Sequence, residues 1–276
     1  MRTSVMVAIA VLTATCMLQI GSPLERPAFA ADAVHFPTTA DDHATLTGYL
    51  SHPNGSGPYP AVIFLPGCDG KLTDIDRVYD SVFAGQNYVV LSFDTHGSRH
   101  LGDTCGRSES VLSALTQAKD AIGANVYLRT LSYVDPNRIV VIGWSWGGSA
   151  ALVASAKALP PAVGAAAATF RTTVAFYPEC GYPQRYSTSP RVPVLILVGT
   201  ADDIAPPDKC ESAAQAAASN GQPVTIRTYD GAEHGFDVLN GPPIFVKALN
   251  GHMAADPAAA AAARTDLMGF LSDNMK

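Results

Sequence analysis

The feature that most constrains this chain is a short segment, residues 143–148, which reads Gly-Trp-Ser-Trp-Gly-Gly. An apolar, β-branched run at residues 139–142 precedes it, and an Ala-rich stretch at residues 148–157 follows it. The order of strand, sharp turn and helix is typical of an elbow that strains the backbone of a serine and exposes its hydroxyl. Glycines on both sides let the strand and the helix approach closely. We therefore expect Ser145 to be a nucleophile; the alternative is a serine in the turn of an ordinary α/β domain.

A serine hydroxyl needs a base that takes its proton, and the base needs an acid that orients it. In chains with this elbow the acid follows the serine and the histidine follows the acid, each after a further strand. Residues 192–198 read as a buried strand, with Asp202 and Asp203 shortly after it. Residues 223–229 read as the next strand, and His234 follows in a loop.

Two choices follow from this spacing. We expect His234 to be the base rather than His252, which lies in a Gly-rich loop before the last helix; the alternative for His234 is a solvated loop histidine. We expect Asp202 to be the orienting acid rather than Asp203, because Asp202 lies nearer to the end of its strand. The carboxylate that does not serve in this way could cap the helical segment that begins near Pro207.

Backbone N–H groups, rather than side chains, stabilise the oxyanion that a serine nucleophile creates. One donor is the residue after the nucleophile, Trp146, and the other comes from the loop after an early strand. Residues 60–65 read as that strand, and residues 66–70 form the loop, in which we expect Cys68 to be the second donor. The alternative is a plain Gly-rich turn.

Five ordered segments make the chain similar to dienelactone hydrolases. The resemblance spans about residues 40–275 and implies an α/β-hydrolase fold, with a mostly parallel sheet flanked by helices, no large lid, and a triad at Ser145, Asp202 and His234. The namesake enzymes use a cysteine where this chain has Ser145, and many relatives have His-Gly where this chain has Pro66-Gly67. The resemblance therefore implies general ester chemistry. The segments are residues 65–70, 138–148, 176–180, 199–202 and 233–236.

Length and composition favour one domain over residues 31–276. The chain has 276 residues, of which 47% are apolar and 15% are charged, enough for one buried core. The net charge of −6 gives no electrostatic basis for binding nucleic acid or an anionic membrane. No zinc-type cysteine and histidine spacing, phosphate loop or dinucleotide fingerprint is visible, so we expect no metal and no cofactor.

Residues 1–30 read as a secretory signal peptide. Arg2 gives a positive start, residues 5–20 are largely apolar, and Ala28-Phe29-Ala30 matches a cleavage site. The apolar run is short for a membrane span, and the residues before Cys16 make a poor lipoprotein signal. We expect an exported protein without a stable membrane anchor; an uncleaved anchor is the alternative.

Export changes how the cysteines are interpreted. Without Cys16, four remain, and an even number in an exported chain suggests disulfides. Because parallel strands bring their following loops together at one edge, we expect Cys68 to pair with Cys105 and Cys180 with Cys210. The alternative is free buried thiols.

Several further expectations concern the surroundings of the site. We expect a helix over residues 108–128, and a last helix that begins at Asp256-Pro257. Trp144 should pack beside the elbow, whereas Trp146 could reach the acyl pocket or pack in the core. Few residues separate Cys180 from Val192, where a lid is usually inserted, so the site should be open.

The loop after the strand at residues 88–93 carries further polar side chains. His96 and His100 should be loop residues at the mouth of the site. Arg99 should pair with Asp94 or Asp103, and a role in substrate binding is the alternative.

Together these patterns predict an exported serine hydrolase that cleaves small-molecule carboxylic esters through an acyl-enzyme. A transferase could use the same triad to pass the acyl group to an alcohol or amine. A binding protein on a hydrolase scaffold is the other alternative, although such proteins commonly lose a triad member. The physiological substrate and the oligomeric state do not follow from the sequence.

Overall fold

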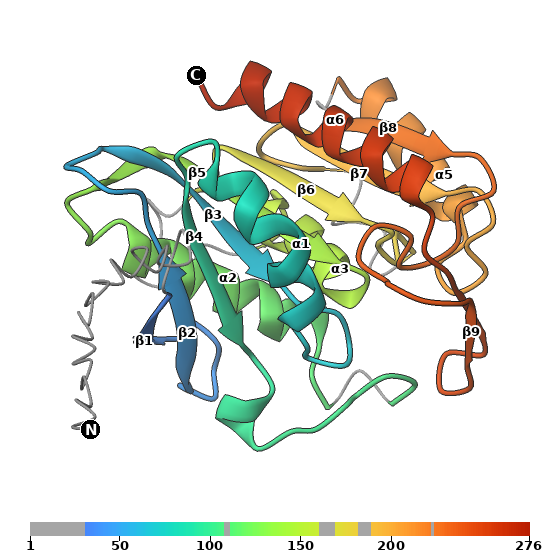
Figure 1. Cartoon of the computed structure of the whole chain (residues 1–276), viewed down its shortest axis with the longest axis horizontal. Helices are drawn as coiled ribbons and strands as arrows, with labels where there is room; N and C mark the ends of the chain where they lie inside the picture. The colour runs from blue at the N-terminus through green and yellow to red at the C-terminus, as the bar shows by residue number, and fades with distance from the viewer. Residues whose placement is uncertain (1–30, 108–110, 160–168, 182–188, 222–223) are drawn as a thin grey trace, which may run out of the picture.

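The computed structural model describes residues 31–107, 111–159, 169–181, 189–221 and 224–276. Its main sheet has eight strands in the order β1-β2-β4-β3-β5-β6-β7-β8 (Figure 1). Strands β3 to β8 run parallel, and β2 and β1 add an antiparallel edge beside β4. The strands are β1 (Asp32–Pro37), β2 (Thr45–Ser51), β3 (Tyr59–Leu65), β4 (Val89–Asp94), β5 (Val134–Trp144), β6 (Thr172–Phe176), β7 (Val194–Gly199) and β8 (Val224–Tyr229).

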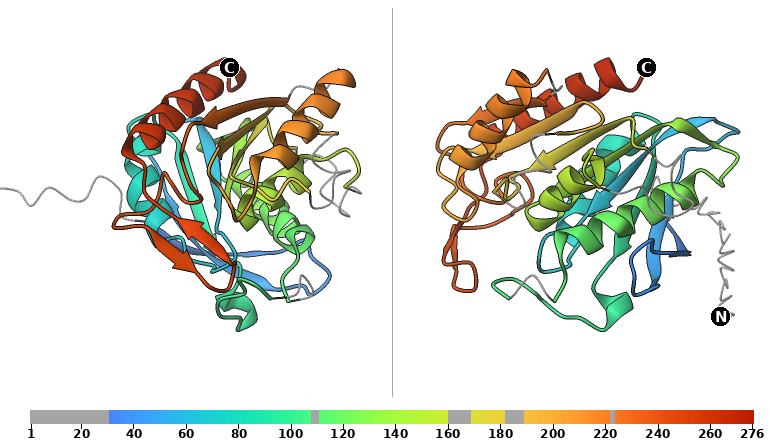
Figure 2. Two further views of the ribbon diagram at one scale, coloured as in Figure 1. Left: turned by 90° about the vertical axis from the view of Figure 1, so that its right-hand side faces the viewer. Right: turned by 180° about the vertical axis from the view of Figure 1, so that it is seen from behind.

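Helices cover both faces of this sheet (Figures 1 and 2). Alternate side chains of each strand point to opposite faces. On β3, Val62 and Phe64 pack with α1 and α6, whereas Ile63 and Leu65 pack with α2 and α3. Helix α5 packs on β7 next to α3. The helices are α1 (Thr73–Ala84), α2 (Ala114–Leu128), α3 (Trp146–Ser155), α5 (Pro207–Ser219), α6 (Pro257–Asn274) and a short 3-10 turn, η1 (Gly97–Arg99).

The arrangement confirms the expected α/β-hydrolase fold, and each of the expected strands is present. The last helix begins as expected, because the Asp256 side chain accepts the N–H groups of Ala258 and Ala259. The helix expected from residue 108 begins only at Ala114, where the Ser113 hydroxyl accepts the N–H of Thr116 and so caps a later turn.

A small hairpin stands apart from the main sheet. Its strands are β9 (Ile244–Val246) and β10 (Gly251–Met253), and it projects on the side where the parallel strands end (Figure 1; Figure 2, left).

Two expectations fall outside the described residues. One is the signal peptide expected at residues 1–30. The other is the short segment between Cys180 and Val192, where we expect no inserted lid and where residues 182–188 are not described. Within the described ranges, no helix combines the length and the apolar character that a bilayer crossing requires.

Candidate active site

Ser145 lies in the strained turn that the sequence predicts. Its φ of 55° and ψ of −119° are unfavourable for a residue with a side chain, and its N–H donates to Phe176 O at 3.0 Å. A Cβ at Gly143 would lie 2.0 Å from Gly147 O, and one at Gly147 would lie 2.4 Å from Leu65 O. Both flanking glycines are therefore required for β5 and α3 to meet at this angle.

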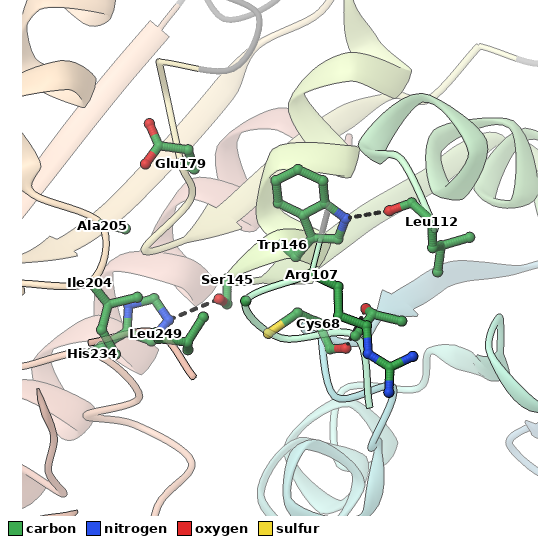
Figure 3. Close-up of a pocket in the computed structure, with 12 residues that line it drawn as sticks. Cys68, Arg107, Leu112, Ser145, Trp146, Glu179, Ile204, Ala205, His234 and Leu249 are labelled. Atoms are coloured by element: carbon green, nitrogen blue, oxygen red, sulfur yellow. Dashed lines mark hydrogen bonds between the residues drawn. The ribbon is translucent and has the colours of Figure 1, made fainter. Parts of the chain in front are cut away.

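His234 and Asp202 complete a hydrogen-bonded chain behind this serine, and Figure 3 shows its link between His234 and Ser145. His234 Nε2 lies 2.8 Å from Ser145 Oγ, and His234 Nδ1 lies 2.8 Å from Asp202 Oδ2. The other oxygen of Asp202 accepts the N–H groups of Ile204 at 3.0 Å and Ala205 at 2.7 Å. Because His234 and Asp202 are only 2% and 3% exposed, their hydrogen bonds are shielded from water.

Asp203 and His252, the alternatives to Asp202 and His234, bind each other. Asp203 Oδ2 lies 2.7 Å from His252 Nδ1, and Asp203 Oδ1 accepts the His252 backbone N–H at 2.7 Å. These hydrogen bonds lower the pKa of Asp203 below its ordinary value. Both side chains are about half exposed. The helix cap considered for the second aspartate is wrong, because Pro206 occupies the cap position of α5 and Asp203 anchors β10.

The loop at residues 66–70 is fixed by hydrogen bonds to its carbonyl groups. Buried Gln117 on α2 donates to Pro66 O at 2.9 Å, and Gly70 N–H donates to Gly67 O at 3.1 Å. The carbonyl and the N–H of a trans peptide point in opposite directions. The bond to Gly67 O therefore turns the Cys68 N–H away from Gly70.

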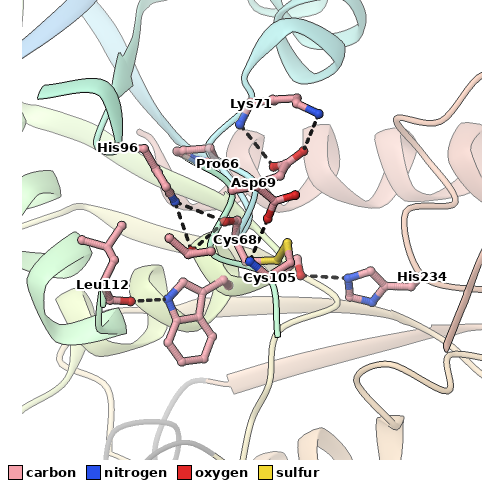
Figure 4. Close-up of a disulfide and its surroundings, with 12 residues drawn as sticks. Pro66, Cys68, Asp69, Lys71, His96, Cys105, Leu112 and His234 are labelled. Carbon is pink, nitrogen blue, oxygen red and sulfur yellow. Dashed lines mark hydrogen bonds and ion pairs between the residues drawn. A yellow bond between two sulfur atoms is a disulfide. The ribbon is translucent and has the colours of Figure 1, made fainter. Parts of the chain in front are cut away.

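The carbonyl group of Cys68 is held by hydrogen bonds as well (Figure 4). Its carbonyl oxygen accepts Thr104 N–H at 2.9 Å, Thr104 Oγ1–H at 2.7 Å, and a hydrogen bond from His96 Nε2 at 3.2 Å. His96 is buried rather than at the mouth of the site, and this burial lowers its pKa, which favours the neutral ring. His100 is exposed and is not among the described residues that line the cavity.

Both expected disulfides are present. Cys68 is joined to Cys105, with Cα atoms 4.9 Å apart, and Cys180 is joined to Cys210, with Cα atoms 5.0 Å apart. The first links the loop after β3 to the loop after β4, and the second links the segment after β6 to α5. The alternative of free thiols is therefore wrong for these four residues.

A cavity of about 220 Å³ opens in front of Ser145. Cys68 and Trp146, the two expected oxyanion donors, both line it (Figure 3). The Trp146 indole donates to Leu112 O at 3.0 Å and packs partly on the core, so it serves both of the alternatives considered for it. Trp144 is buried against Phe176, with ring centroids 5.2 Å apart, as expected for a residue beside the elbow.

Sequence reasoning missed a buried carboxylate behind the site. Asp237 accepts hydrogen bonds from Tyr79 Oη at 2.6 Å, Trp144 Nε1 at 3.0 Å and Tyr177 Oη at 2.8 Å. The Tyr177 ring lies against His234, with centroids 4.5 Å apart. Burial raises the pKa of Asp237, and the three donated hydrogen bonds oppose that shift. One signal was available, since Asp237 is a lone acid in an apolar stretch three residues after His234.

The expected partners of Arg99 are wrong. Its guanidinium donates two hydrogen bonds of 2.9 Å to Asp120 and two hydrogen bonds, of 2.6 and 3.4 Å, to Asp42. Asp94 instead accepts the N–H groups that open η1. The Asp120 side chain is fully buried on α2, where an unpaired carboxylate would be costly. Arg99 is not among the described residues that line the cavity, so the substrate role considered for it finds no support.

Over the described ranges, no group of three or more histidine, cysteine, aspartate or glutamate side chains is arranged to hold a metal ion.

Comparison with known proteins gives a family match. The profile of the dienelactone hydrolase family matches residues 46–274. Quorum-quenching protein AidA of Acinetobacter baumannii is 30% identical over 111 residues, which are 40% of this chain and 36% of that protein. Esterase FrsA of Shigella boydii is 29% identical over 116 residues, 41% of this chain and 26% of that protein. The chain thus spans only about a third or less of the length of these relatives.

Among solved structures, a putative dienelactone hydrolase from Klebsiella pneumoniae superposes with a TM-score of 0.67. It is 18% identical, and the superposition covers 88% of this chain and 99% of that one. At 18% identity, this structural similarity shows a shared fold and nothing further.

Proposed function

This chain belongs to the dienelactone hydrolase family, and we propose that it is an exported serine hydrolase that cleaves carboxylic esters through an acyl-enzyme. One observation carries the proposal. It is the continuous hydrogen-bonded chain from Ser145 through His234 to Asp202, with 2.8 Å at each link, at the wall of a cavity.

The mechanism follows from that order. With Nδ1–H donating to Asp202, Nε2 of His234 accepts the Ser145 hydroxyl proton as Oγ attacks the ester carbonyl. The N–H groups of Trp146 and Cys68 donate to the oxyanion of the tetrahedral intermediate. The protonated His234 then gives its proton to the leaving alkoxide, which departs as the alcohol. Water, activated by His234, attacks the acyl-enzyme and releases the acid.

The fixed loop around Cys68 supports its assignment as an oxyanion donor. A donor stabilises developing charge most when it is already oriented before the reaction. The Gly70 N–H fixes the Gly67–Cys68 peptide through the Gly67 carbonyl oxygen. Thr104 binds the Cys68 carbonyl oxygen, and the disulfide to Cys105 fixes the Cys68 side chain. Loss of one such donor typically lowers kcat about 10²- to 10³-fold.

Two features support export. Residues 1–30 have the composition and the Ala-Phe-Ala ending of a signal peptide, and the remaining cysteines lie in two disulfides. Disulfides persist in oxidising compartments outside the cytoplasm. Mass analysis of the protein recovered from outside the cytoplasm should give an N-terminus at Ala31; a full-length chain that stays with the membrane would contradict the proposal.

The catalytic proposal is tested with a fluorophosphonate probe and a set of short esters, applied to the protein with its disulfides intact. The probe should label Ser145, and Ser145→Ala should lose both labelling and about 10⁶-fold in turnover while it stays folded. His234→Ala should lose activity, whereas His35→Ala, a substitution of an exposed histidine on β1, should not. Folded Ser145→Ala with normal turnover would refute the mechanism.

The transferase alternative is tested by adding an alcohol to the reaction. A transferase would then form a new ester in place of the free acid.

A further inference from the structure

The cavity in front of Ser145 is small for a substrate site. Its volume of about 220 Å³ lies below the range of about 300–1,000 Å³ that is usual for ligand pockets. An ester therefore either fits within this space or has one part that extends out of it. The side chains at each end of the cavity decide which part of the ester is limited in length.

The proposed mechanism determines which end receives the acyl part. The carbon that Ser145 attacks carries the oxyanion, the alkoxide that leaves and the acyl chain. The oxyanion faces the N–H groups of Trp146 and Cys68, and the alkoxide faces His234, which gives it a proton. The acyl chain takes the remaining direction, on the side of Ser145 away from His234.

The side chain of Trp146 lies at this end of the cavity. Figure 3 shows the Trp146 indole and Leu112 on the side of Ser145 opposite to His234, and both residues line the cavity. Trp146 directly follows the nucleophile, so its side chain begins beside the reacting carbon. An acyl chain that extends away from His234 therefore meets the indole.

The indole is held in place. Its Nε1–H donates to Leu112 O at 3.0 Å, and the side chain packs against the core between the sheet, α2 and α3. Leu112 is only 4% exposed and directly precedes Ser113, which caps α2. Because a packed interior has little free volume, a long chain that displaced the indole or Leu112 would destabilise the complex.

We propose that the Trp146 side chain closes the acyl end of the cavity and makes the protein selective for esters of short acids, from acetate to butyrate. The inference rests on the proposed ester hydrolysis. Trp146 then has two tasks, since its backbone N–H donates to the oxyanion and its side chain limits the acyl chain. One methylene group more or less in an apolar pocket changes kcat/KM by about 10- to 200-fold, so one side chain is enough for this selection.

A series of para-nitrophenyl esters tests the inference, because the alcohol stays the same while the acid lengthens from acetate through butyrate and hexanoate to octanoate. For the wild-type protein, kcat/KM should be highest for acetate or butyrate and about tenfold or more lower for octanoate. Trp146→Ala should raise the ratio of kcat/KM for octanoate to that for acetate about tenfold, because the chain can occupy the space of the indole. Trp146→Phe, which keeps an aromatic ring, should give an intermediate ratio.

A second variant keeps the test independent of how well Trp146→Ala folds. Leu112→Ala widens the same end of the cavity from the neighbouring side chain, and the Leu112 carbonyl that holds the indole remains. This variant should raise the same ratio, although less than Trp146→Ala does.

Ile204 provides the matched control, because it lines the cavity on the side of His234 (Figure 3). Ile204→Ala removes apolar volume at the other end and should leave the ratio of octanoate to acetate unchanged.

Three outcomes would overturn the inference while ester hydrolysis stands. They are equal kcat/KM of the wild-type protein for octanoate and acetate, an unchanged ratio in both Trp146→Ala and Leu112→Ala, and an equal rise of the ratio in Ile204→Ala. No hydrolysis of any ester by the wild-type protein would overturn the proposed function as well.

Discussion

Asp203 binds His252 through its side chain and so holds β10 in place, with 2.7 Å between Oδ2 and Nδ1. Its neighbour Asp202 binds His234 at 2.8 Å. Two consecutive carboxylates thus carry separate tasks, one at the surface and one in the buried triad.

This division gives a prediction for the two aspartates. Asp202→Asn should lower kcat about 10⁴-fold, because the amide favours the wrong tautomer of His234. Asp203→Asn should have a mild effect, since it leaves the triad intact. Steady-state kinetics of both variants on one short ester checks this, and the reverse pattern would reassign the acid.

A second prediction concerns Asp237. Asp237→Asn replaces a carboxylate that accepts three hydrogen bonds by an amide whose NH₂ group cannot accept. One buried donor would lose its partner, which should lower the free energy of unfolding by about 1–3 kcal/mol. Turnover should fall too, since Trp144 precedes Ser145 and Tyr177 lies against His234. Urea unfolding and kcat measure both effects, with exposed Asp273→Asn as the control.

A third prediction concerns pH and Asp76 on α1. Burial and the neighbouring Asp80 raise the pKa of Asp76 to about 7 in the folded chain, against about 3.9 in unfolded chains. Between these pH values the folded state holds a proton that the unfolded state has lost, so stability decreases as pH rises from about 4 to 7. Asp76→Asn removes this loss and should raise Tm relative to wild type at pH 8 but not at pH 4. An equal shift at both pH values would contradict the assignment.

A fourth prediction separates the two disulfides. Replacing Cys180 and Cys210 together by serine opens a link across 30 residues and should cost about 3–4 kcal/mol of stability in the chain-entropy model. Replacing Cys68 and Cys105 should also lower kcat, because Cys68 is the proposed oxyanion donor and loses part of its anchorage. Thermal unfolding and kcat at a temperature where both variants are folded test the distinction. Equal kcat losses in the two variants would remove the special role of the first disulfide.

The sequence predicts well those features whose residues are close together in the chain or occur in a fixed order along it. The elbow around Ser145 is readable because the strand, the glycines and the helix are contiguous, and the positions of Asp202 and His234 follow from strand ends. The Asp237 network is not readable in this way, since it joins side chains from α1, β5 and the segment after β6. The partners of Arg99 were missed for the same reason. Asp120 is 21 residues away in sequence, and only the packing of α2 makes the pairing necessary.

The order of the disulfides along the chain has a consequence for maturation. Beyond residue 30, the first cysteine pairs with the second and the third with the fourth, so the two closed loops do not overlap. A chain that leaves a membrane channel N-terminus first presents its cysteines to an oxidant in that same order. Oxidation of each cysteine with the next one to emerge then gives the native pairs directly. This connectivity needs no isomerase to rearrange wrong pairs, even where thiol–disulfide exchange is slow.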